Sequence, residues 1–289
     1  MIIRPVKDIS SADLQELLNN MAKGKIDDKN MEISQASIKS LRKYLKRLFS
    51  YLSSEGYCHD VSCNLVLPKI ASAMDNHKIK QIEVFTDEEI KKIITTPNRK
   101  QFMFQLALAT GLRAGEILAL KYTDIEDGNV KVSKQLNNHY AIDSDGYRQY
   151  VNVIKKPKST SSVRTVPIPD NIQKAFEKYK TEHMAEMLRN GYRTEFLFTS
   201  ESGKLLDKGN LRVAWVRHLK RAGIPYKKFH CCRSTYCTIL CRQGVSLETA
   251  SKLMGHSDIN VTAEFYRFIG QPEMKKAAEK IDNLFSIQN

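Results

Sequence analysis

Six side chains in four short stretches of the 289-residue chain could together carry out chemistry on a phosphate. They are Arg113, Lys158, His230, Arg233, His256 and Tyr266. The cations and imidazoles can bind and neutralise a phosphodiester, and a tyrosine hydroxyl can attack phosphorus. Because the sequence has no HExxH, no acidic cluster at metal spacing and no GxxxxGK[ST] loop, we expect no metal and no cofactor. Such residues would cut nucleic acid and conserve the energy of the broken bond in a phosphotyrosine link.

Arg113 lies in "ATGLRAGEILAL", after a glycine that separates two apolar helical stretches. An arginine there would be partly buried and would need an anion or a carboxylate as its partner, and Glu116 could supply the carboxylate. Lys158 lies in "KKPKSTSSVRTVPIP", where a predicted strand gives way to a Ser- and Thr-rich hairpin. A lysine at a hairpin tip can reach a bound substrate, but it can equally be a surface residue. Lys155 and Lys156 are close alternatives to Lys158.

His230 and Arg233 are three residues apart, so on a helix they share one face. An imidazole beside a bidentate guanidinium suits a phosphate, although an HxxR pattern by itself arises often by chance. His256 follows the glycine that we expect to end a short helix capped by Ser246. Tyr266 falls in the next predicted helix, where it could be an ordinary core aromatic or an exposed nucleophile.

The segment "SQASIKSLRKYLKRLFSYLSSEG" predicts a helix with one apolar and one basic face. The expected apolar residues are Ile38, Leu41, Leu45, Leu48 and Leu52. The expected basic residues are Lys39, Arg42, Lys43, Lys46 and Arg47. Five cations within nine residues, with no acid among them, favour a helix that binds DNA phosphates. A solvated basic face is the alternative.

The elements around these residues must position them. We expect a helix over residues 8–22 with a Ser or Asp cap. Residues 66–84 contain a proline and scattered lysines without clear periodicity, which is typical of a linker between domains. The stretch "FTDEEIKKII" predicts a new helix with Thr86 as its cap and acids in its first turn.

Residues 101–120 predict two apolar helical stretches separated by "TGLR". The runs "NVKVSKQ", "QYVNVIKK" and "RTVPIP" predict strands, with the turn-rich "NNHYAIDSDG" between the first two. After residue 170 the pattern is mostly helical, and Asn260 is the expected cap of the last helix that carries Tyr266. The sequence therefore predicts a mainly α fold with a small antiparallel β-sheet in the catalytic domain.

The composition favours a nucleic-acid partner. The chain has 46 Lys and Arg against 32 Asp and Glu, a formal charge of +14, which points to a polyanion; a solvated basic surface is the alternative. No run of about 18 apolar residues could span a membrane. The first residues, "MIIRPVKDISSADL", lack the apolar core of a signal peptide. We therefore expect a cytoplasmic, DNA-associated protein without a membrane partner.

The chain contains six cysteines, which we expect to be free thiols in a reducing compartment. The last four, together with His230, raise the possibility of a zinc site, but they form no pair of CxxC motifs. Cys237 and Cys241 are four residues apart, as on the buried face of a helix. We therefore expect small buried side chains and no metal site.

Taken in order, the stretches "TGLRAGEI", the lysine hairpin ending in "RTVPI", HxxR, "LMGHSDI" and the late tyrosine closely resemble the tyrosine recombinases, particularly phage and conjugative-transposon integrases. The resemblance covers residues 84–270 in detail. It implies a two-domain, C-shaped clamp around double-stranded DNA recombination sites. It also implies a 3′-phosphotyrosyl intermediate, strand exchange through a Holliday junction, and integration and excision of a mobile element.

The resemblance also implies a role for each residue. Arg113 and Arg233 would hold the scissile phosphate, and His256 would bind a non-bridging oxygen. Lys158 would be the general acid, His230 would assist proton transfer, and Tyr266 would be the nucleophile. The sequence departs from the family beside the second arginine, where Cys232 and Ser234 replace the frequent Leu and His.

From this resemblance and the patterns above we expect four segments. These are a helical core-binding domain over 1–72, a linker over 73–83, the catalytic domain over 84–270 and a tail helix over 271–289. The family implies a homotetramer on two DNAs, with a dimer on each site and the tail docked on a neighbouring protomer. Accessory DNA-bending or excision proteins could take part. Relaxation of DNA as by a type IB topoisomerase, and a non-catalytic DNA-binding regulator, are the alternative functions.

Overall fold

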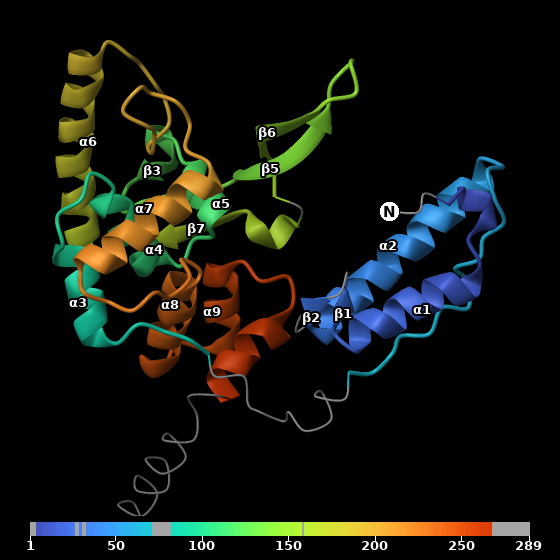
Figure 1. Ribbon diagram of the computed structural model, residues 1–289. Helices are drawn as coiled ribbons and strands as arrows, with labels where there is room; N and C mark the ends of the chain where they lie inside the picture. The colour runs from blue at the N-terminus through green and yellow to red at the C-terminus, as the bar shows by residue number, and fades with distance from the viewer. Residues whose placement is uncertain (1–3, 27–28, 31–32, 71–81, 158, 268–289) are drawn as a thin grey trace, which may run out of the picture. The chain divides into compact units, whose positions relative to one another are not determined.

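The chain forms two compact units, Met1–Gln81 and Ile82–Asn289. Figure 1 shows the computed structural model, in which helices predominate and the strands are few. The residues described are 4–26, 29–30, 33–70, 82–157 and 159–267. The mainly helical fold with small antiparallel sheets confirms the predicted fold class. The predicted tail helix, 271–289, lies outside the described residues.

The first unit is built around two helices. Its elements are η1 (Val6–Asp8), α1 (Ser11–Ala22), β1 (Lys25–Ile26), β2 (Lys29–Asn30) and α2 (Gln35–Ser54). The helix expected from residue 8 begins only at Ser11, because Ser10 and Asp13 form a reciprocal capping box at that point. The Ser10 hydroxyl accepts from the amide of Asp13, whose carboxylate accepts from the amide of Ser10 at 2.8 Å.

The core of the first unit comprises Leu14, Leu18, Ile38, Phe49 and Leu65. The predicted apolar stripe of α2 is correct at Ile38, but it is wrong at Leu48, which is 49% exposed. The neighbouring Phe49 points into the core and buries a larger apolar surface than a leucine could. The packing of the large ring therefore sets the rotation of the helix at this turn.

The helices of the second unit begin and end as the local sequence dictates. They are α3 (Asp87–Thr95), α4 (Gln101–Thr110), α5 (Ala114–Leu118), α6 (Asp170–Asn190), α7 (Lys208–Arg221), α8 (Cys231–Arg242) and α9 (Leu247–Met254), with a further helical stretch over 259–267. Thr86 caps α3 as predicted, and its hydroxyl accepts from the amide of Glu89. The core centres on Trp215, whose ring lies 5.0 Å from that of Phe104 and 5.9 Å from that of Phe85.

The strands of the second unit form two separate antiparallel sheets. Strands β3 (Ile125–Glu126), β4 (Asn129–Val132) and β7 (Arg164–Pro167) form one sheet, in the order β3-β4-β7; β5 (Gln135–Ile142) and β6 (Arg148–Lys155) form a two-stranded ribbon. Short 3₁₀ turns occur at η3 (Tyr122–Asp124) and η4 (Thr160–Ser162). In Figure 1 the ribbon extends outward beside α5.

The expected turn in "NNHYAIDSDG" is wrong for its first six residues, which belong to β5. Cross-strand pairing explains the difference, because Tyr140 lies opposite Tyr150 in the register and their rings are 5.2 Å apart. The run "NVKVSKQ", expected as one strand, is divided between β4 and β5. Across the described part of the chain, no helix is both long and apolar enough to cross a bilayer.

Candidate active site

Arg113 is placed by a glycine turn between α4 and α5. Gly111 ends α4 with a φ of 60°, and a Cβ there would lie 2.5 Å from Cδ1 of Tyr236, so both the backbone angle and the space favour glycine. Arg113 becomes the N-cap residue of α5. Its amide donates to Oε2 of Glu116 and its Nη1 to Oε1, both at 2.9 Å. Glu116 is thus the carboxylate partner considered from the sequence.

Arg233 lies in the first turn of α8, and His230 is the N-cap residue of the same helix. The Arg233 guanidinium donates from Nη1 to the carbonyl of Gly111 at 2.8 Å and from Nη2 to the carbonyl of Met254. Arg233 is only 3% exposed. The HxxR pair is therefore tied to the turn that precedes Arg113 and to the end of α9.

Ser246 caps the start of α9 and Gly255 ends the helix in a left-handed conformation, as predicted. Its last carbonyls have no partner within the helix, and three arginines supply one. Arg164 donates from Nε to the carbonyl of Leu253 at 2.7 Å. Arg233 donates to the next carbonyl, and Arg113 to that of Gly255 at 3.1 Å. Three arginines from three segments thus hold three successive carbonyls immediately before His256.

Glu116 supplies the negative charge inside this cluster. Its side chain is 1% exposed, and it accepts from Arg164 at 3.2 and 3.0 Å as well as from Arg113. Burial alone would raise the pKa of Glu116, but the hydrogen bonds and charges of Arg164 and Arg113 outweigh it and lower the pKa. Three guanidinium groups around one carboxylate leave an excess of positive charge, which suits a bound phosphate.

His256 adjoins the same cluster. Its Nδ1 shares a 2.8 Å hydrogen bond with the hydroxyl of Thr262. Burial, followed by the charges of Arg233, Arg113 and Arg164, lowers the pKa of His256 to about 4. The imidazole is therefore neutral at physiological pH, and in that form it can donate one hydrogen bond.

Burial and the charges of Arg233 and Arg113 also lower the pKa of His230. Burial and the charge of Arg113 lower the pKa of Arg233 to about 9, so that guanidinium remains cationic at neutral pH. An anion placed among these groups would relieve the repulsion between them. The electrostatics of the cluster therefore favour binding of an anion.

The Tyr266 hydroxyl donates to the backbone carbonyl of Val245, after α8. The side chain is partly buried against a small core cluster made of Tyr236, Cys237, Cys241 and Met254. Burial, then the Cys241 thiol, raises the pKa of Tyr266. We expected the arginines and His256 to stabilise negative charge on this oxygen, but the groups that act most on it are two thiols and Glu248. In this arrangement the phenol is protonated and its hydrogen is bound to a carbonyl.

The helix that carries Tyr266 starts at residue 259, two residues before the first helical residue expected after a cap at Asn260. Asn260 is not its cap; the carboxylate of Asp258 accepts from the amide of Asn260 at 2.9 Å. Lys158 lies outside the described residues, so its role remains a prediction. The prediction that Cys237 and Cys241 form a buried helix face is confirmed, since they are 0% and 4% exposed.

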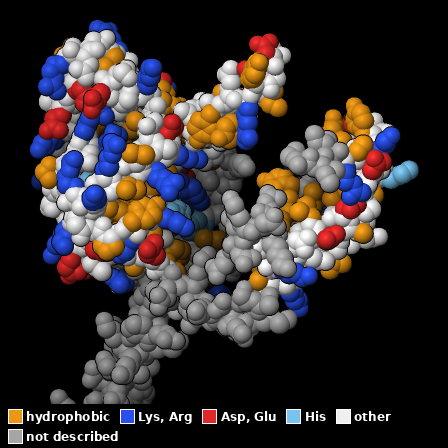
Figure 2. Space-filling view, viewed as in Figure 1, with side chains coloured by type: hydrophobic (Ala, Val, Ile, Leu, Met, Phe, Trp, Pro, Cys, Tyr) orange, Lys and Arg blue, Asp and Glu red, His pale blue; other side chains and the backbone are white. Residues whose placement is uncertain are grey.

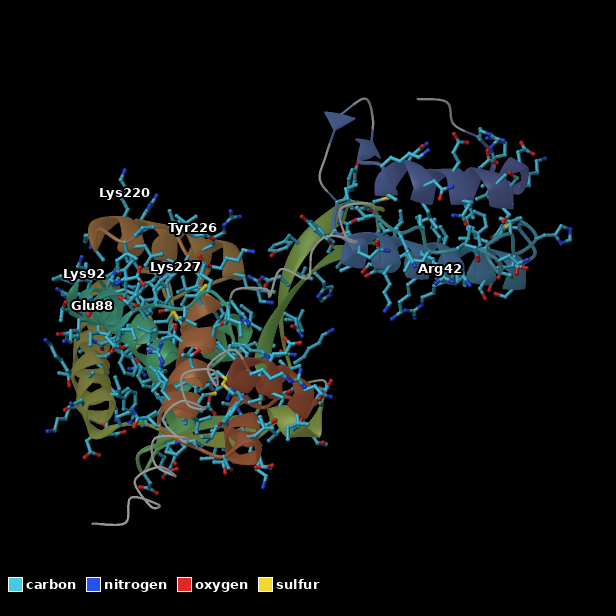
Figure 3. All side chains as sticks on the ribbon, turned by 90° about the horizontal axis from the view of Figure 1, so that it is seen from below. Arg42, Glu88, Lys92, Lys220, Tyr226 and Lys227 are labelled. Carbon is cyan, nitrogen blue, oxygen red and sulfur yellow. The ribbon has the colours of Figure 1, made fainter. Side chains whose placement is uncertain are left out.

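In the first unit the basic residues of α2 fall into two groups. Lys39, Lys43 and Arg47 are exposed. Arg42, labelled in Figure 3, donates from Nε to the carbonyl of Leu65 at 2.7 Å, and Lys46 donates to that of Cys63 at 2.8 Å. Three of the five cations are thus exposed and can bind phosphates, whereas the other two also form hydrogen bonds with the segment that follows the helix.

Figure 2 shows that Lys and Arg side chains are abundant on the visible face of the second unit as well.

The sequence pattern of the phage integrase family matches residues 83–269 of the chain. The chain belongs to this family. A relative named "Tyrosine recombinase XerC-like", from Caldanaerobacter subterraneus subsp. tengcongensis, is 37% identical over 266 residues, which is 87% of this chain and 67% of the relative. The ICEBs1 integrase of Bacillus subtilis is 26% identical over 215 residues, 71% of this chain and 55% of that protein.

Solved structures show the same fold. The Tn1549 transposon integrase in complex with a circular intermediate DNA superposes with a TM-score of 0.66 at 18% identity, covering 96% of this chain and 87% of that one. XerH bound to a palindromic difH substrate gives 0.61 at 20% identity, covering 94% and 72%. Together with the family match and the 37% identical relative, this makes the chain an enzyme, a tyrosine-type site-specific DNA recombinase. Neither topoisomerase-like relaxation nor a purely DNA-binding role is favoured.

Arg164 was not predicted from the sequence as a member of the cluster, although it is the first residue of the predicted strand "RTVPIP". Its position was the one signal for it, because Arg164 alternates with the apolar Val166 and Ile168 on the face of the strand that is buried. The structure brings together Arg113, Arg233, His230 and His256, as expected, and adds Glu116 and Arg164 to them. Tyr266, on the helical stretch over 259–267, packs against a separate small cluster that includes residues of α8, and its hydroxyl is bound to the carbonyl of Val245.

Proposed function

We propose that the chain integrates and excises a mobile element by cutting and rejoining duplex DNA at specific sites. The observation that carries this proposal is the cluster of three arginines and a neutral histidine around the end of α9, which suits a phosphodiester. The integrase and transposon relatives support a mobile element as the source of the DNA sites.

The residue roles follow from the chemistry of the cluster. Arg113 and Arg233 bind the non-bridging oxygens of the scissile phosphate, because each guanidinium has more N–H donors than its carbonyl and carboxylate partners use. Neutral His256 donates a further hydrogen bond, and His230 assists proton transfer. The Tyr266 oxygen attacks phosphorus as its proton passes to neutral His230, and the displaced 5′-oxygen takes a proton from Lys158.

The products of this step are a 3′-phosphotyrosyl bond and a free 5′-hydroxyl. The 5′-hydroxyl of the partner DNA then attacks the phosphotyrosine and gives its proton to Lys158, while the Tyr266 oxygen leaves and takes a proton back from His230. Two such exchanges pass through a Holliday junction. Because the Tyr266 hydroxyl is bound to Val245, residues 259–267 must move before the first attack, and we propose that binding of DNA and a second protomer releases them.

We also propose the wider assembly. Residues 1–72 form the core-binding domain, with Lys39, Lys43 and Arg47 of α2 on the DNA backbone, and residues 84–270 form the catalytic domain. Four protomers assemble on two DNAs, a dimer on each site, and the tail over 271–289 docks on a neighbouring protomer.

Covalent capture tests the proposal and does not require a defined DNA site at the outset. Full-length protein is mixed with a library of nicked duplexes whose sequence is randomised around the nick, and DNA that stays with denatured protein is recovered and sequenced. We expect enrichment of one related set of sequences and recombination between two copies of it. Recovery of no covalent DNA, or relaxation of plasmids without any strand exchange, would reject the proposal.

A further inference from the structure

Arg164 is the one member of the arginine cluster to which the proposed reaction gives no task. It is the first residue of β7, and its side chain is 6% exposed. Its guanidinium donates to the carbonyl of Leu253 at 2.7 Å, to that of Ser162 at 3.2 Å, and to both oxygens of Glu116. One side chain therefore joins the end of α9, the turn before β7 and the start of α5.

We propose that Arg164 is a positioning residue for the active site, which fixes Arg113, through Glu116, relative to the carbonyls that precede His256. This inference rests on the proposed function. Glu116 is the link, because its Oε1 accepts from Nη1 of both arginines and its Oε2 accepts from Nη2 of Arg164 and from the amide of Arg113. The carboxylate cannot turn without moving Arg113.

The task requires the shape of arginine as well as its charge. A planar guanidinium can bind a carboxylate with two parallel hydrogen bonds and still direct Nε to a third partner, whereas a lysine ammonium is a compact charge on a flexible stem. The site is also shaped for this group, since a Cβ at Gly255 would lie 2.9 Å from Nη1 of Arg164. The backbone of the turn before His256 thus rests directly on the guanidinium.

Arg164 also acts on His256 through its charge. The pKa of this imidazole is lowered first by burial and then by the charges of Arg233, Arg113, Arg164 and His230. Loss of the Arg164 charge, together with loosening of the turn, should therefore bring the titration of His256 closer to the usual value near 6.5. This effect can be measured on free protein.

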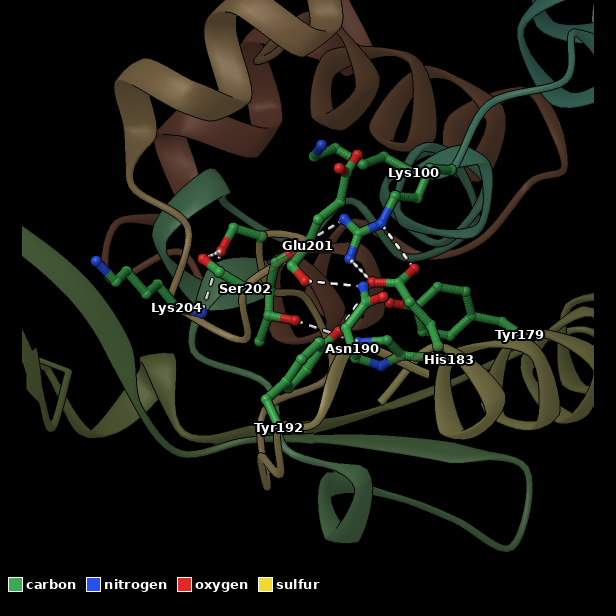
Figure 4. A network of polar contacts seen from close by, with 12 residues as sticks. Lys100, Tyr179, His183, Asn190, Tyr192, Glu201, Ser202 and Lys204 are labelled. Atoms are coloured by element: carbon green, nitrogen blue, oxygen red, sulfur yellow. Dashed lines mark hydrogen bonds and ion pairs between the residues drawn. The ribbon is translucent and has the colours of Figure 1, made fainter. Parts of the chain in front are cut away.

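The test compares full-length Arg164→Lys and Arg164→Gln proteins with a matched control, Arg99→Lys. Arg99 makes the same kind of contact elsewhere in the second unit: it binds both oxygens of Glu186, at 2.9 and 2.5 Å, and the carbonyl of Thr199 at 2.8 Å. Figure 4 shows polar contacts of this region, with Tyr192 labelled, whose hydroxyl donates to the same Glu186 at 2.8 Å. The control therefore reports what loss of a guanidinium fork does to the fold alone.

Two readouts are taken at a temperature at which Trp215 fluorescence shows every variant folded. The first is single-turnover cleavage of the captured duplex, together with its binding affinity. We expect both Arg164 variants to bind DNA within about twofold of wild type and to cleave about 10- to 100-fold more slowly, since a displacement of about 1 Å can cost this much. Arg99→Lys should cleave within about threefold of wild type.

The second readout is the NMR titration of His256 without DNA, in which Arg164→Gln should titrate at higher pH than wild type. Cleavage by Arg164→Lys at the wild-type rate, or equal losses in Arg164→Lys and Arg99→Lys, would overturn the inference. An unchanged His256 titration in Arg164→Gln would overturn it too. The titration needs no DNA, so it tests the positioning role of Arg164 even if the wild-type protein forms no covalent adduct. Failure to form an adduct would reject the proposed function but would leave the titration result standing.

Discussion

Replacement of Glu116 by glutamine should strongly destabilise the second unit. The carboxylate is 1% exposed and is shared by Arg113 and Arg164, so its loss leaves buried guanidinium charge without a counter-charge. Removal of one partner from a buried ion pair costs about 3–5 kcal/mol. For a unit of this size, each kcal/mol corresponds to about 2–4 °C in Tm. We therefore expect the Tm to fall by roughly 6–20 °C.

The sequence provides a selective probe for this measurement. Trp215 is the only tryptophan of the chain, it is fully buried, and it lies in the second unit. Its fluorescence during thermal or urea unfolding therefore follows that unit alone. The matched control is Glu186→Gln, which removes the partner of Arg99 from a pair whose side chains are 26% and 16% exposed. It should cost about 1–2 kcal/mol.

The effect of Glu116→Gln should depend on pH with a defined sign. The pKa of Glu116 is lower in the folded protein than the value near 4.3 of an unfolded chain. Its stabilising contribution is therefore fully present above that value and is lost as the pH falls through the folded pKa. A loss of stability no larger than that of Glu186→Gln at neutral pH would refute the reasoning that the buried carboxylate neutralises the arginine cluster.

Further predictions concern titration, DNA contacts and assembly. His256 should titrate near pH 4 by NMR, and a midpoint near 6.5 would contradict its burial among cations. Because its pKa is lower in the folded protein than in the unfolded chain, the free energy of unfolding should decrease as the pH falls from about 6.5 towards 4. DNA affinity should fall steeply with salt, with a slope of log affinity against log salt near −7 if about eight phosphates are neutralised, and a slope near zero would contradict contact with the DNA backbone. Lys43→Ala should weaken binding to all DNA sequences equally, and a change in sequence preference would contradict a phosphate contact. Deletion of residues 273–289 should impair assembly or control of cleavage more than DNA binding, and unchanged recombination by the truncated chain would contradict a docking role.

Much of the fold could be predicted from local signals. Thr86 and Ser246 cap their helices as expected, because a side-chain hydroxyl that accepts from an amide two or three residues on needs only local sequence. Strand β5 could not be predicted in the same way. Asn137 and Asn138 at its centre are turn-forming types, and pairing with β6 across the ribbon overrides that preference.

The candidate site shows the same division. Arg113, Arg233 and His256 could be picked out by type and by their place beside glycine turns. The positioning role of Arg164 could not be predicted from the sequence, because it depends on contacts with Glu116 and Leu253, which lie 48 and 89 residues away in the chain. The hydrogen bond from Tyr266 to Val245 could not be predicted from the sequence either, since it depends on how the helical stretch over 259–267 packs on α8.

The most direct test of the proposed reaction is to identify the residue that becomes joined to DNA. Protein captured on the enriched nicked duplex is digested with nuclease and protease, and the peptide that retains a nucleotide is sequenced by mass spectrometry. We predict a phosphotyrosine at Tyr266, and full loss of the adduct in Tyr266→Phe with folding and DNA affinity unchanged. A nucleotide on Tyr236, the nearest rival tyrosine in the motif region, or an adduct that persists in Tyr266→Phe, would contradict the assignment of Tyr266 as the nucleophile.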